Sequence, residues 1–485
     1  MLKVYNSLSR KIEDFKPLKD GHVKIYVCGP TVYSYLHVGN FRGPVFFNFV
    51  RNWLEHLGYK VEYAVNFTDV DDKIIKRAQD EKVSATDISE KYIAEYKKDF
   101  KALGLRAHDH NPKVTTYMPQ IIDFVKTLIE KEQAYVSGGD VNFSISKFKD
   151  YGKLSGRKVD DLLEGVRIDV NDKKQSPLDF ALWKTAKPGE NLQGSSWESP
   201  WGAGRPGWHI ECSAMVKALF GNQIDIHGGG LDLLFPHHEN EVAQSESCTG
   251  EHYAKYWMHW NMLNFSGNKM SKSLGNVVNM HDFLQTNHAE IYKWMILSSH
   301  YRSLADFSDS TLDFAVAGLA RVYSALSLAT SLCNEQTPFD KIFEVECKNT
   351  WDKMTEALNH DFGTPAAFAE MFELVRKYNA QVKRGAKVNV PSAAISKSFL
   401  SLMNKFGSLL SLFQESPAEF LIKLDDMLLE KKKLTRAQVN QLVEARAQAR
   451  ANKDFAKSDE LRKKLTEMGI SVSDLTDGSF WEVTK

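Results

Sequence analysis

The chain has 485 residues, of which 43% are hydrophobic and 26% are charged, and its 62 basic residues balance 62 acidic ones. This length allows about two to four domains, and the composition excludes a disordered or fibrous protein. The zero formal charge excludes a general attraction to nucleic acid, so a nucleic-acid partner would need a local basic patch.

The N-terminal segment MLKVYNSLSRKIEDF lacks the charged, apolar and small-residue order of a secretion signal, and the apolar runs elsewhere are short. The 5 cysteines are odd in number and widely scattered, which argues against a disulfide framework and leaves metal ligation or plain burial. We therefore expect a cytoplasmic protein without a membrane partner.

A strand, a helix and a second strand follow. Residues 23–30, VKIYVCGP, have the β-branched and aromatic content of a buried strand; residues 37–59 have helical spacing of apolar residues; residues 60–72, KVEYAVNFTDVDD, form another strand that ends in polar residues. In such a β-α-β unit, the end of the first strand and the start of the helix form a crevice suited to phosphates.

The sheet pattern is then interrupted. Residues 135–205 are rich in Gly, Ser, Asp and Trp and predict an insertion with its own strands, after which QIDIHGGGLDLLF and YWMHWNMLNF resume the parallel sheet. From residue 310 to 422, apolar residues at helical intervals predict a helix bundle, and the charged tail predicts two amphipathic helices ended by Gly469. We therefore expect one split α/β domain followed by helical parts.

Two loops contain residues that suit a polyphosphate. Gly39 lets a ligand approach the backbone, while His37 and Asn40 supply hydrogen bonds beside a helix start. Lys269 and Lys272, in SGNKMSKSLGN, could neutralise charge on phosphoryl oxygens. A generic strand-to-helix turn and a solvated basic loop are the structural alternatives, but the string KMSKS is far more specific than a pair of lysines.

Both strings resemble the paired signatures of class I aminoacyl-tRNA synthetases, His-Ile-Gly-His and Lys-Met-Ser-Lys-Ser. The second match, residues 269–273, is complete, whereas the first departs from the family at Asn40, where a second histidine is usual. Because asparagine both donates and accepts hydrogen bonds, we expect contact with ATP to persist, but not a role that requires an imidazole.

A third motif, FPHHENEVAQ, gathers metal-capable groups at a helix start. His237 and Glu241 are four residues apart and project from one helix face, while His238 and Glu239 are expected to point elsewhere. Such a pair alone is more often a surface or core contact than a metal site. With Cys28 at a strand end and Cys212 in WHIECSAM, however, the donor types become those that zinc accepts.

A zinc ion beside the nucleotide crevice would bind the thiolate of a small substrate. The hydroxyl of serine has a far higher pKa and is a poorer zinc ligand, so the metal would discriminate where an apolar pocket could not. The donor set therefore predicts cysteine as the substrate, without an editing domain.

Five segments resemble the cysteinyl-tRNA synthetase family in sequence and order: VCGPTVY, NFTDVDDKI, GWHIECSAM, DIHGGGLDLLFPHHENEVAQSE and NKMSKSLGN. The resemblance covers the whole chain. It implies one zinc ion held by Cys28, Cys212, His237 and Glu241, and a cysteine pocket formed by Cys28, Thr68, Trp208 and His237. It also implies Mg²⁺ with ATP, catalytic roles for His37, Asn40, Lys269 and Lys272, and ATP contacts from His37, Gly39, Asn40, His227, Gly229, Asp232 and Lys272. Cys248, Cys333 and Cys347 match no ligand position, and we expect them to be buried or without a role.

The tail places basic residues around Phe455, a combination that suits stacking on an unpaired base, although many exposed helices look the same. The resemblance implies that this is the anticodon-binding region, with Arg450, Phe455 and Asp474 as base contacts.

The resemblance implies an α/β fold: a Rossmann-like parallel-sheet catalytic domain with an insertion, an α-helical bundle and a small C-terminal anticodon-binding domain. The predicted parts are 1–118 and 206–262 (halves of the catalytic domain), 119–205 (insertion), 263–312 (stem-contact region with the KMSKS loop), 313–425 (bundle) and 426–485 (anticodon-binding domain).

The predicted function is ATP-dependent activation of L-cysteine and its transfer to the 3′ end of tRNA(Cys) by a monomer. Two alternatives remain: a paralogous ligase that passes cysteine to a small amine, and a catalytically inactive RNA- or zinc-binding regulator. The basic and aromatic tail favours tRNA over the small amine. The presence of both Lys269 and Lys272 argues against an inactive protein.

Overall fold

The computed structural model describes residues 1–158, 174–187, 194–265, 268–269, 277–383, 389–475 and 478–485. The chain divides into two compact units. Unit 1 comprises Met1–Phe283, His300–Asp306 and Asn359–Phe362, and unit 2 comprises Leu284–Ser299, Phe307–Leu358 and Gly363–Lys485. This division is coarser than the predicted domain boundaries and leaves them as predictions.

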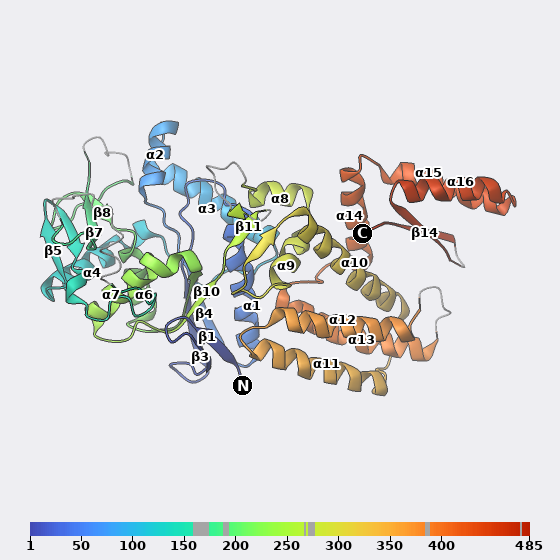
Figure 1. Ribbon diagram of the computed structural model, residues 1–485, viewed down its shortest axis with the longest axis horizontal. Helices are drawn as coiled ribbons and strands as arrows, with labels where there is room; N and C mark the ends of the chain where they lie inside the picture. Colours follow the sequence, from blue (N-terminus) through green and yellow to red (C-terminus); the bar gives the residue numbers. More distant parts are fainter. Residues whose placement is uncertain (159–173, 188–193, 266–267, 270–276, 384–388, 476–477) are drawn as a thin grey trace. The chain divides into compact units, whose positions relative to one another are not determined.

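Unit 1 is built on a four-stranded parallel sheet in the order β10-β9-β3-β4 (Figure 1). Its strands are β3 (His22–Val27), β4 (Lys60–Val65), β9 (Ile224–Gly230) and β10 (Ala254–Trp260). All seven residues of β9 are buried, as expected for a central strand covered on both faces. The strands predicted from the sequence are therefore confirmed, and the carboxyl ends of β3 and β9 lie side by side.

Helices connect the strands of this sheet. Their bounds are η1 (Val38–Phe41), α1 (Arg42–His56), α2 (Asp72–Glu81), α3 (Ala85–Ala102), η2 (Val114–Tyr117), α4 (Met118–Glu130), α6 (Ile210–Phe220), η4 (Leu231–Leu233), η5 (Leu234–His238) and α7 (Glu239–Thr249). Helix α1 carries the chain from β3 to β4 and is buried over most of its length because Phe, Val and Trp recur at helical spacing.

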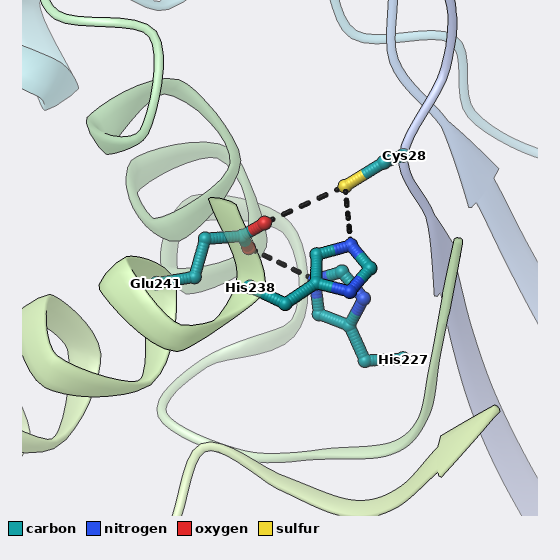
Figure 2. A group of neighbouring side chains, drawn as sticks. All are labelled: Cys28, His227, His238 and Glu241. Carbon is teal, nitrogen blue, oxygen red and sulfur yellow. Dashed lines mark hydrogen bonds and ion pairs between the residues drawn. The ribbon is translucent and has the colours of Figure 1, made fainter. Parts of the chain in front are cut away.

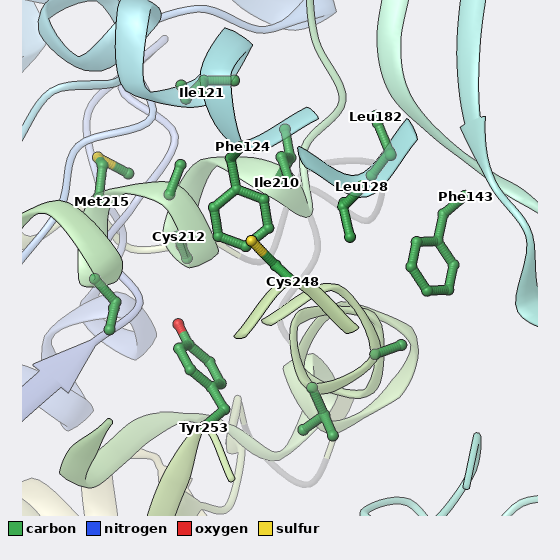
Figure 3. Close-up of a cluster of buried hydrophobic side chains, with 14 of the residues drawn as sticks. Ile121, Phe124, Leu128, Phe143, Leu182, Ile210, Cys212, Met215, Cys248 and Tyr253 are labelled. Atoms are coloured by element: carbon green, nitrogen blue, oxygen red, sulfur yellow. The ribbon is translucent and has the colours of Figure 1, made fainter. Parts of the chain in front are cut away.

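The predicted insertion forms an antiparallel sheet in the order β5-β6-β7-β8. Its elements are β5 (Ala134–Ser137), β6 (Asp140–Phe143), η3 (Ile145–Lys147), β7 (Phe180–Thr185) and β8 (Gly204–Pro206). Phe143 and Leu182 from this sheet share one buried cluster with residues of α4 and α6, including Phe124 and Ile210 (Figure 3). The insertion therefore packs on the helices that carry the metal-capable residues.

Short strands complete unit 1. The hairpin of β1 (Lys3–Asn6) and β2 (Lys11–Asp14) was not predicted, and β11 (Leu263–Phe265), β12 (Asn268–Lys269) and β13 (Ala305–Phe307) form a second small sheet. Helix α8 (Met280–Thr286) begins in unit 1 and ends in unit 2.

Unit 2 is helical, as predicted. Its helices are α9 (Ala289–Leu297), α10 (Asp309–Leu332), α11 (Lys341–Asn359), α12 (Thr364–Gln381), α13 (Val390–Leu410), α14 (Pro417–Lys431), α15 (Arg436–Ala451) and α16 (Phe455–Glu467). Helix α10 has the length and composition of a membrane span, but half of its apolar window is buried and it packs against α9, α12, α13 and α14. Such burial is typical of the core helix of a bundle.

The C-terminal part of unit 2 has its own core. The helices α15 and α16 were predicted, and α16 is followed by Gly469 in the left-handed conformation. The hairpin of β14 (Ile470–Leu475) and β15 (Gly478–Val483) was missed, and it packs on both helices through Val439, Leu465, Ile470 and Val483.

Candidate active site

The first signature forms a closed turn between β3 and α1. His37 is the residue before η1, and its backbone N–H donates to Oδ1 of Asn40 at 3.1 Å. Asn40 therefore fixes the shape of the turn itself, a role that an amide oxygen performs well.

The chain beyond the second signature is paired to this turn. The backbone N–H of Val38 donates to the carbonyl of Val278 at 2.9 Å, and that of Met280 donates to the carbonyl of Leu36 at 2.9 Å. Before the signature, Lys269 pairs with Asn264 in the β11–β12 hairpin. Lys272 lies outside the described residues, and its role remains a prediction.

A cavity of about 650 Å³ opens at the carboxyl end of the sheet. Its volume suits a small-molecule substrate or nucleotide. Six of the predicted site residues line it: Cys28, His37, Gly39, Asn40, Trp208 and Asp232. Among the described residues that line the cavity, Lys73 is the only lysine or arginine.

The four predicted zinc ligands converge in one cluster, of which Cys28 also lines the cavity. The Cys28 Sγ atom lies 3.7 Å from Cys212 Sγ, 3.5 Å from His237 Nε2 and 3.5 Å from Glu241 Oε1. The His237 Nε2 atom lies 3.0 Å from the same Glu241 oxygen. Zinc bonds of about 2.0–2.3 Å in a tetrahedron require ligand atoms about 3.3–3.8 Å apart. The donor types and the three separations from Cys28 fit a zinc ion, and the His237–Glu241 pair, at 3.0 Å, would have to part slightly to admit it.

The electrostatics of this cluster act in opposite directions on its two thiols: burial and the neighbouring Cys212 raise the pKa of Cys28 well above its ordinary value. Hydrogen bonding from Cys28 lowers the pKa of the Cys212 thiol to about 6. Burial opposes a charged His237, but the Glu241 carboxylate and Cys212 outweigh it and raise the pKa of that imidazole to about 10. Burial likewise opposes ionisation of Glu241, yet His227 and His237 hold the pKa of its carboxyl well below the ordinary value.

The expectation that His238 points away from the cluster is wrong. Its Nε2 lies 3.4 Å from Cys28 Sγ, so Cys28, His227, His238 and Glu241 form a second group of donors within 4.8 Å of one another (Figure 2). The helical spacing rule fails here because Phe235 is extended and the regular helix begins only at Glu239. Glu239 does point elsewhere, as expected.

Further contacts hold the ligands in place, and of the residues that make them the sequence did not indicate Tyr253, His209 and His259. His227 Nε2 and the Tyr253 hydroxyl contact the second oxygen of Glu241 at 2.9 and 3.0 Å. The rings of His209 and His237 meet through their Nδ1 atoms at 3.0 Å, and His238 contacts His259 at 2.7 Å. Partners of this kind orient metal ligands. The only hint of these partners in the sequence was the presence of His209 in GWHIEC and His259 in YWMHW.

Of the residues predicted for the cysteine pocket, Trp208 lines the cavity and Thr68 does not. Trp208 is 40% exposed and stacks on the His237 ring at 4.3 Å, between the ligand cluster and the cavity. Thr68 is buried and donates from its hydroxyl to Glu211 at 2.9 Å. Neither Thr68 nor Gly229 is among the described residues that line the cavity.

His227, expected beside ATP, lies beneath the cavity. It is fully buried, stacks on Trp257 and contacts Glu241. Gly229 has a packing reason, because a Cβ there would come within 2.3 Å of the His238 ring. We therefore leave both residues out of the proposed nucleotide contacts.

The residues predicted to contact tRNA lie in unit 2. Phe455 is 65% exposed at the start of α16. Asp474 accepts from both terminal nitrogens of Arg446 at 2.8 and 3.0 Å and also pairs with Arg450. The hydrogen bonds from Arg446 lower the pKa of Asp474 to about 2, so this carboxylate and these arginines form one charged group.

The three remaining cysteines belong to neither group of metal-capable donors found among the described residues. Cys248 and Cys347 are buried and Cys333 is partly buried. Burial raises the pKa of the Cys248 thiol, which packs among apolar residues of α4 and α6 (Figure 3).

Three family models match: the tRNA synthetases class I (C) catalytic domain over residues 14–317, the DALR domain over 353–414 and the cysteinyl-tRNA ligase anticodon binding domain over 435–481. The chain is 64% identical to the cysteine–tRNA ligase of Bdellovibrio bacteriovorus, with 100% of both proteins covered. It is 43% identical to that of Halalkalibacterium halodurans, with 99% of both covered.

Among solved structures, the chain is similar to Mycobacterium tuberculosis methionyl-tRNA synthetase in complex with methionyl-adenylate. The TM-score is 0.61 at 13% sequence identity, and the match covers 90% of this chain and 96% of that one. At this identity the likeness concerns the fold alone, and it confirms the predicted class I architecture with its parallel sheet and helical C-terminal parts.

Proposed function

The chain belongs to the cysteine–tRNA ligase family of class I aminoacyl-tRNA synthetases, and on this premise we propose that it activates L-cysteine with ATP and transfers it to the 3′ end of tRNA(Cys). One observation carries the choice of amino acid. Cys28 both lines the cavity and belongs to the cluster of two thiols, an imidazole and a carboxylate. A small substrate in the cavity would therefore place its side chain beside residues that can hold a zinc ion, which binds thiolates.

Cys28, Cys212, His237 and Glu241 would hold one zinc ion per chain. When bound, zinc would supply a preference for a substrate thiolate over a hydroxyl, which separates cysteine from serine. Trp208 would cover this end of the cavity, since its ring lies flat on His237. Thr68 would contribute through Glu211, the residue beside Cys212.

ATP would occupy the end of the cavity at η1. His37, Gly39 and Asn40 line the wall there, and Asp232 lines it from the segment after β9. Lys269 and Lys272 would reach the nucleotide from the signature that precedes Val278 and Met280, whose backbone is paired to this turn. Mg²⁺ would accompany the triphosphate.

In the first step, a carboxylate oxygen of cysteine would attack the α-phosphorus of ATP, a new P–O bond would form, and pyrophosphate would leave with the electrons of the broken bond. No side chain need act as nucleophile, so the chain would contribute positioning and stabilisation of charge on the phosphoryl oxygens, chiefly from Lys272, Lys269 and His37. In the second step, a ribose hydroxyl at the tRNA 3′ end would attack the acyl carbon and release AMP.

We propose that the C-terminal part reads the anticodon. Its match to an anticodon binding domain and the exposed Phe455 beside Arg450 support tRNA over a small amine as the acceptor. We also propose that the protein acts as a monomer in the cytoplasm.

The test is exchange of labelled pyrophosphate into ATP by the purified protein. We expect exchange that requires cysteine and is not supported by serine, together with charging of a tRNA transcript bearing the GCA anticodon. Charging should fall when that anticodon is changed. Equal exchange with serine would refute the substrate assignment, and cysteine-dependent exchange without charging would favour the small-amine ligase.

A further inference from the structure

Two of the metal-capable residues, His237 and His238, lie in the irregular segment that leads into α7. His237 and His238 precede the regular part of α7, and Phe235 before them is extended, with φ −141° and ψ 132°. Besides the direct contacts of the His237 ring with His209 and of the His238 ring with His259, contacts made by residues 235 and 239–240 therefore fix the backbone that carries both imidazoles.

Those contacts come from one turn of the insertion, residues 151–157. Glu239 is fully buried, and its two carboxylate oxygens accept from the backbone N–H groups of Gly152 at 2.9 Å and Ser155 at 2.6 Å. The Tyr151 hydroxyl donates to Oδ1 of Asn240 at 2.5 Å. A buried carboxylate that loses such donors becomes costly, so α7 and the turn must move together.

The same turn also reaches the other side of the histidine pair. The guanidinium of Arg157 lies 4.4 Å from the centre of the Phe235 ring, in cation–π geometry. The turn thus contacts the chain two residues before His237, at Phe235, and immediately after His238, at Glu239.

The turn itself is tightly closed. Gly152 has φ +95°, and a Cβ at this position would come within 1.9 Å of the Arg157 carbonyl oxygen. Only glycine permits that approach. The shape of the turn is therefore set independently of α7.

We propose that the 151–157 turn positions the metal-ligand segment, with Glu239 as the positioning residue, so that the insertion sets the metal affinity and the cysteine selectivity of the active site. This inference rests on the proposed function. The alternative is that these contacts only stabilise the fold, in which case their loss would weaken cysteine binding and ATP binding equally.

The first variant is Glu239→Gln in the full-length protein loaded with zinc. An amide keeps the shape but has one acceptor oxygen, so its NH₂ group would face one of the two backbone N–H donors. We expect zinc transfer to a chromogenic chelator to become about 10- to 100-fold faster, the range typical for partners of metal ligands. The KM for cysteine should rise while the KM for ATP stays unchanged.

The second variant, Gly152→Ala, changes the 151–157 turn and leaves α7 itself unaltered. It should also speed zinc release and raise the KM for cysteine without changing the KM for ATP. The matched control is Ser247→Ala, which removes a hydrogen bond from α7 to Gln133, an insertion residue outside the 151–157 turn. It should leave zinc release and both KM values unchanged.

Two results would overturn the proposal: zinc release at the wild-type rate in both Glu239→Gln and Gly152→Ala, or an equal loss of cysteine and ATP binding in both. Failure of the proposed function would look different, because the wild-type protein would then show no cysteine-dependent exchange at all. The zinc-release measurement does not depend on that activity.

Discussion

Replacing Cys212 by serine tests the central assignment most directly. The residue is 2% exposed, and its sulfur lies 3.7 Å from that of Cys28, inside the donor cluster. Serine is nearly isosteric, so the change removes a thiolate without opening a large cavity. The hydroxyl that replaces it is a poor zinc ligand.

The size of the effect follows from the number of ligands. Zinc sites of this kind have apparent binding free energies of about 10–16 kcal/mol, so each of four ligands accounts for about 2.5–4 kcal/mol. Since about 1.4 kcal/mol is a factor of ten, Cys212→Ser should weaken zinc binding about 10²- to 10³-fold.

The assay measures zinc content after dialysis against a graded chelator, followed by the KM values for cysteine and ATP. We expect loss of zinc and a raised KM for cysteine with little change for ATP. Cys248→Ser is the matched control, because Cys248 is buried in the same apolar cluster but belongs to neither donor group. Retention of zinc by Cys212→Ser, or equal loss of both substrates, would refute the reasoning.

Three further predictions concern other parts of the chain. Lys272→Ala should slow pyrophosphate exchange about 10²- to 10³-fold without changing zinc content, and an unchanged rate would remove this lysine from the mechanism. Phe455→Ala should raise the KM for tRNA about 5- to 150-fold, as expected for loss of one stacked base, and leave exchange intact; a lowered exchange rate would contradict its assignment. Burial raises the pKa of Asp99, which is 7% exposed, to about 6, so its contribution to stability is full below the unfolded value near 4 and is lost as the pH rises through 6. Asp99→Asn should therefore stabilise the protein by up to about 3 kcal/mol at pH 8 and by less at pH 5 in urea unfolding, and equal gains at both would be inconsistent with this origin.

The parallel sheet was predictable because its strands are apolar runs that end at glycine or polar residues. Cys28 and His37 could be placed at one crevice for the same reason, since the carboxyl ends of parallel strands meet at one edge. The joining of Cys212 to that edge required the resemblance, because no spacing rule relates residues so distant in sequence.

Other features depend on tertiary structure or on signals that were overlooked. The direction of His238 follows from the extended Phe235, which no helical periodicity reveals. In the sequence, His227 stands before three glycines, as a residue that contacts a nucleotide would. Only the structure reveals that its ring is fully buried and stacks on Trp257. The β14–β15 hairpin did have a signal, since Asp477-Gly478 lies between alternating residues.

The candidate active site joins a buried cluster of metal-capable side chains to the accessible turn at η1. Under the proposed function, discrimination between cysteine and serine would rest on four side chains that are almost entirely buried, with Glu241 held between His227, His237 and Tyr253. ATP, by contrast, would meet the turn at η1, to which the backbone of Val278 and Met280 is paired. A rigid end that selects the amino acid and an accessible end that admits the nucleotide explain why substitutions at Cys212 and Lys272 should separate the two substrates cleanly.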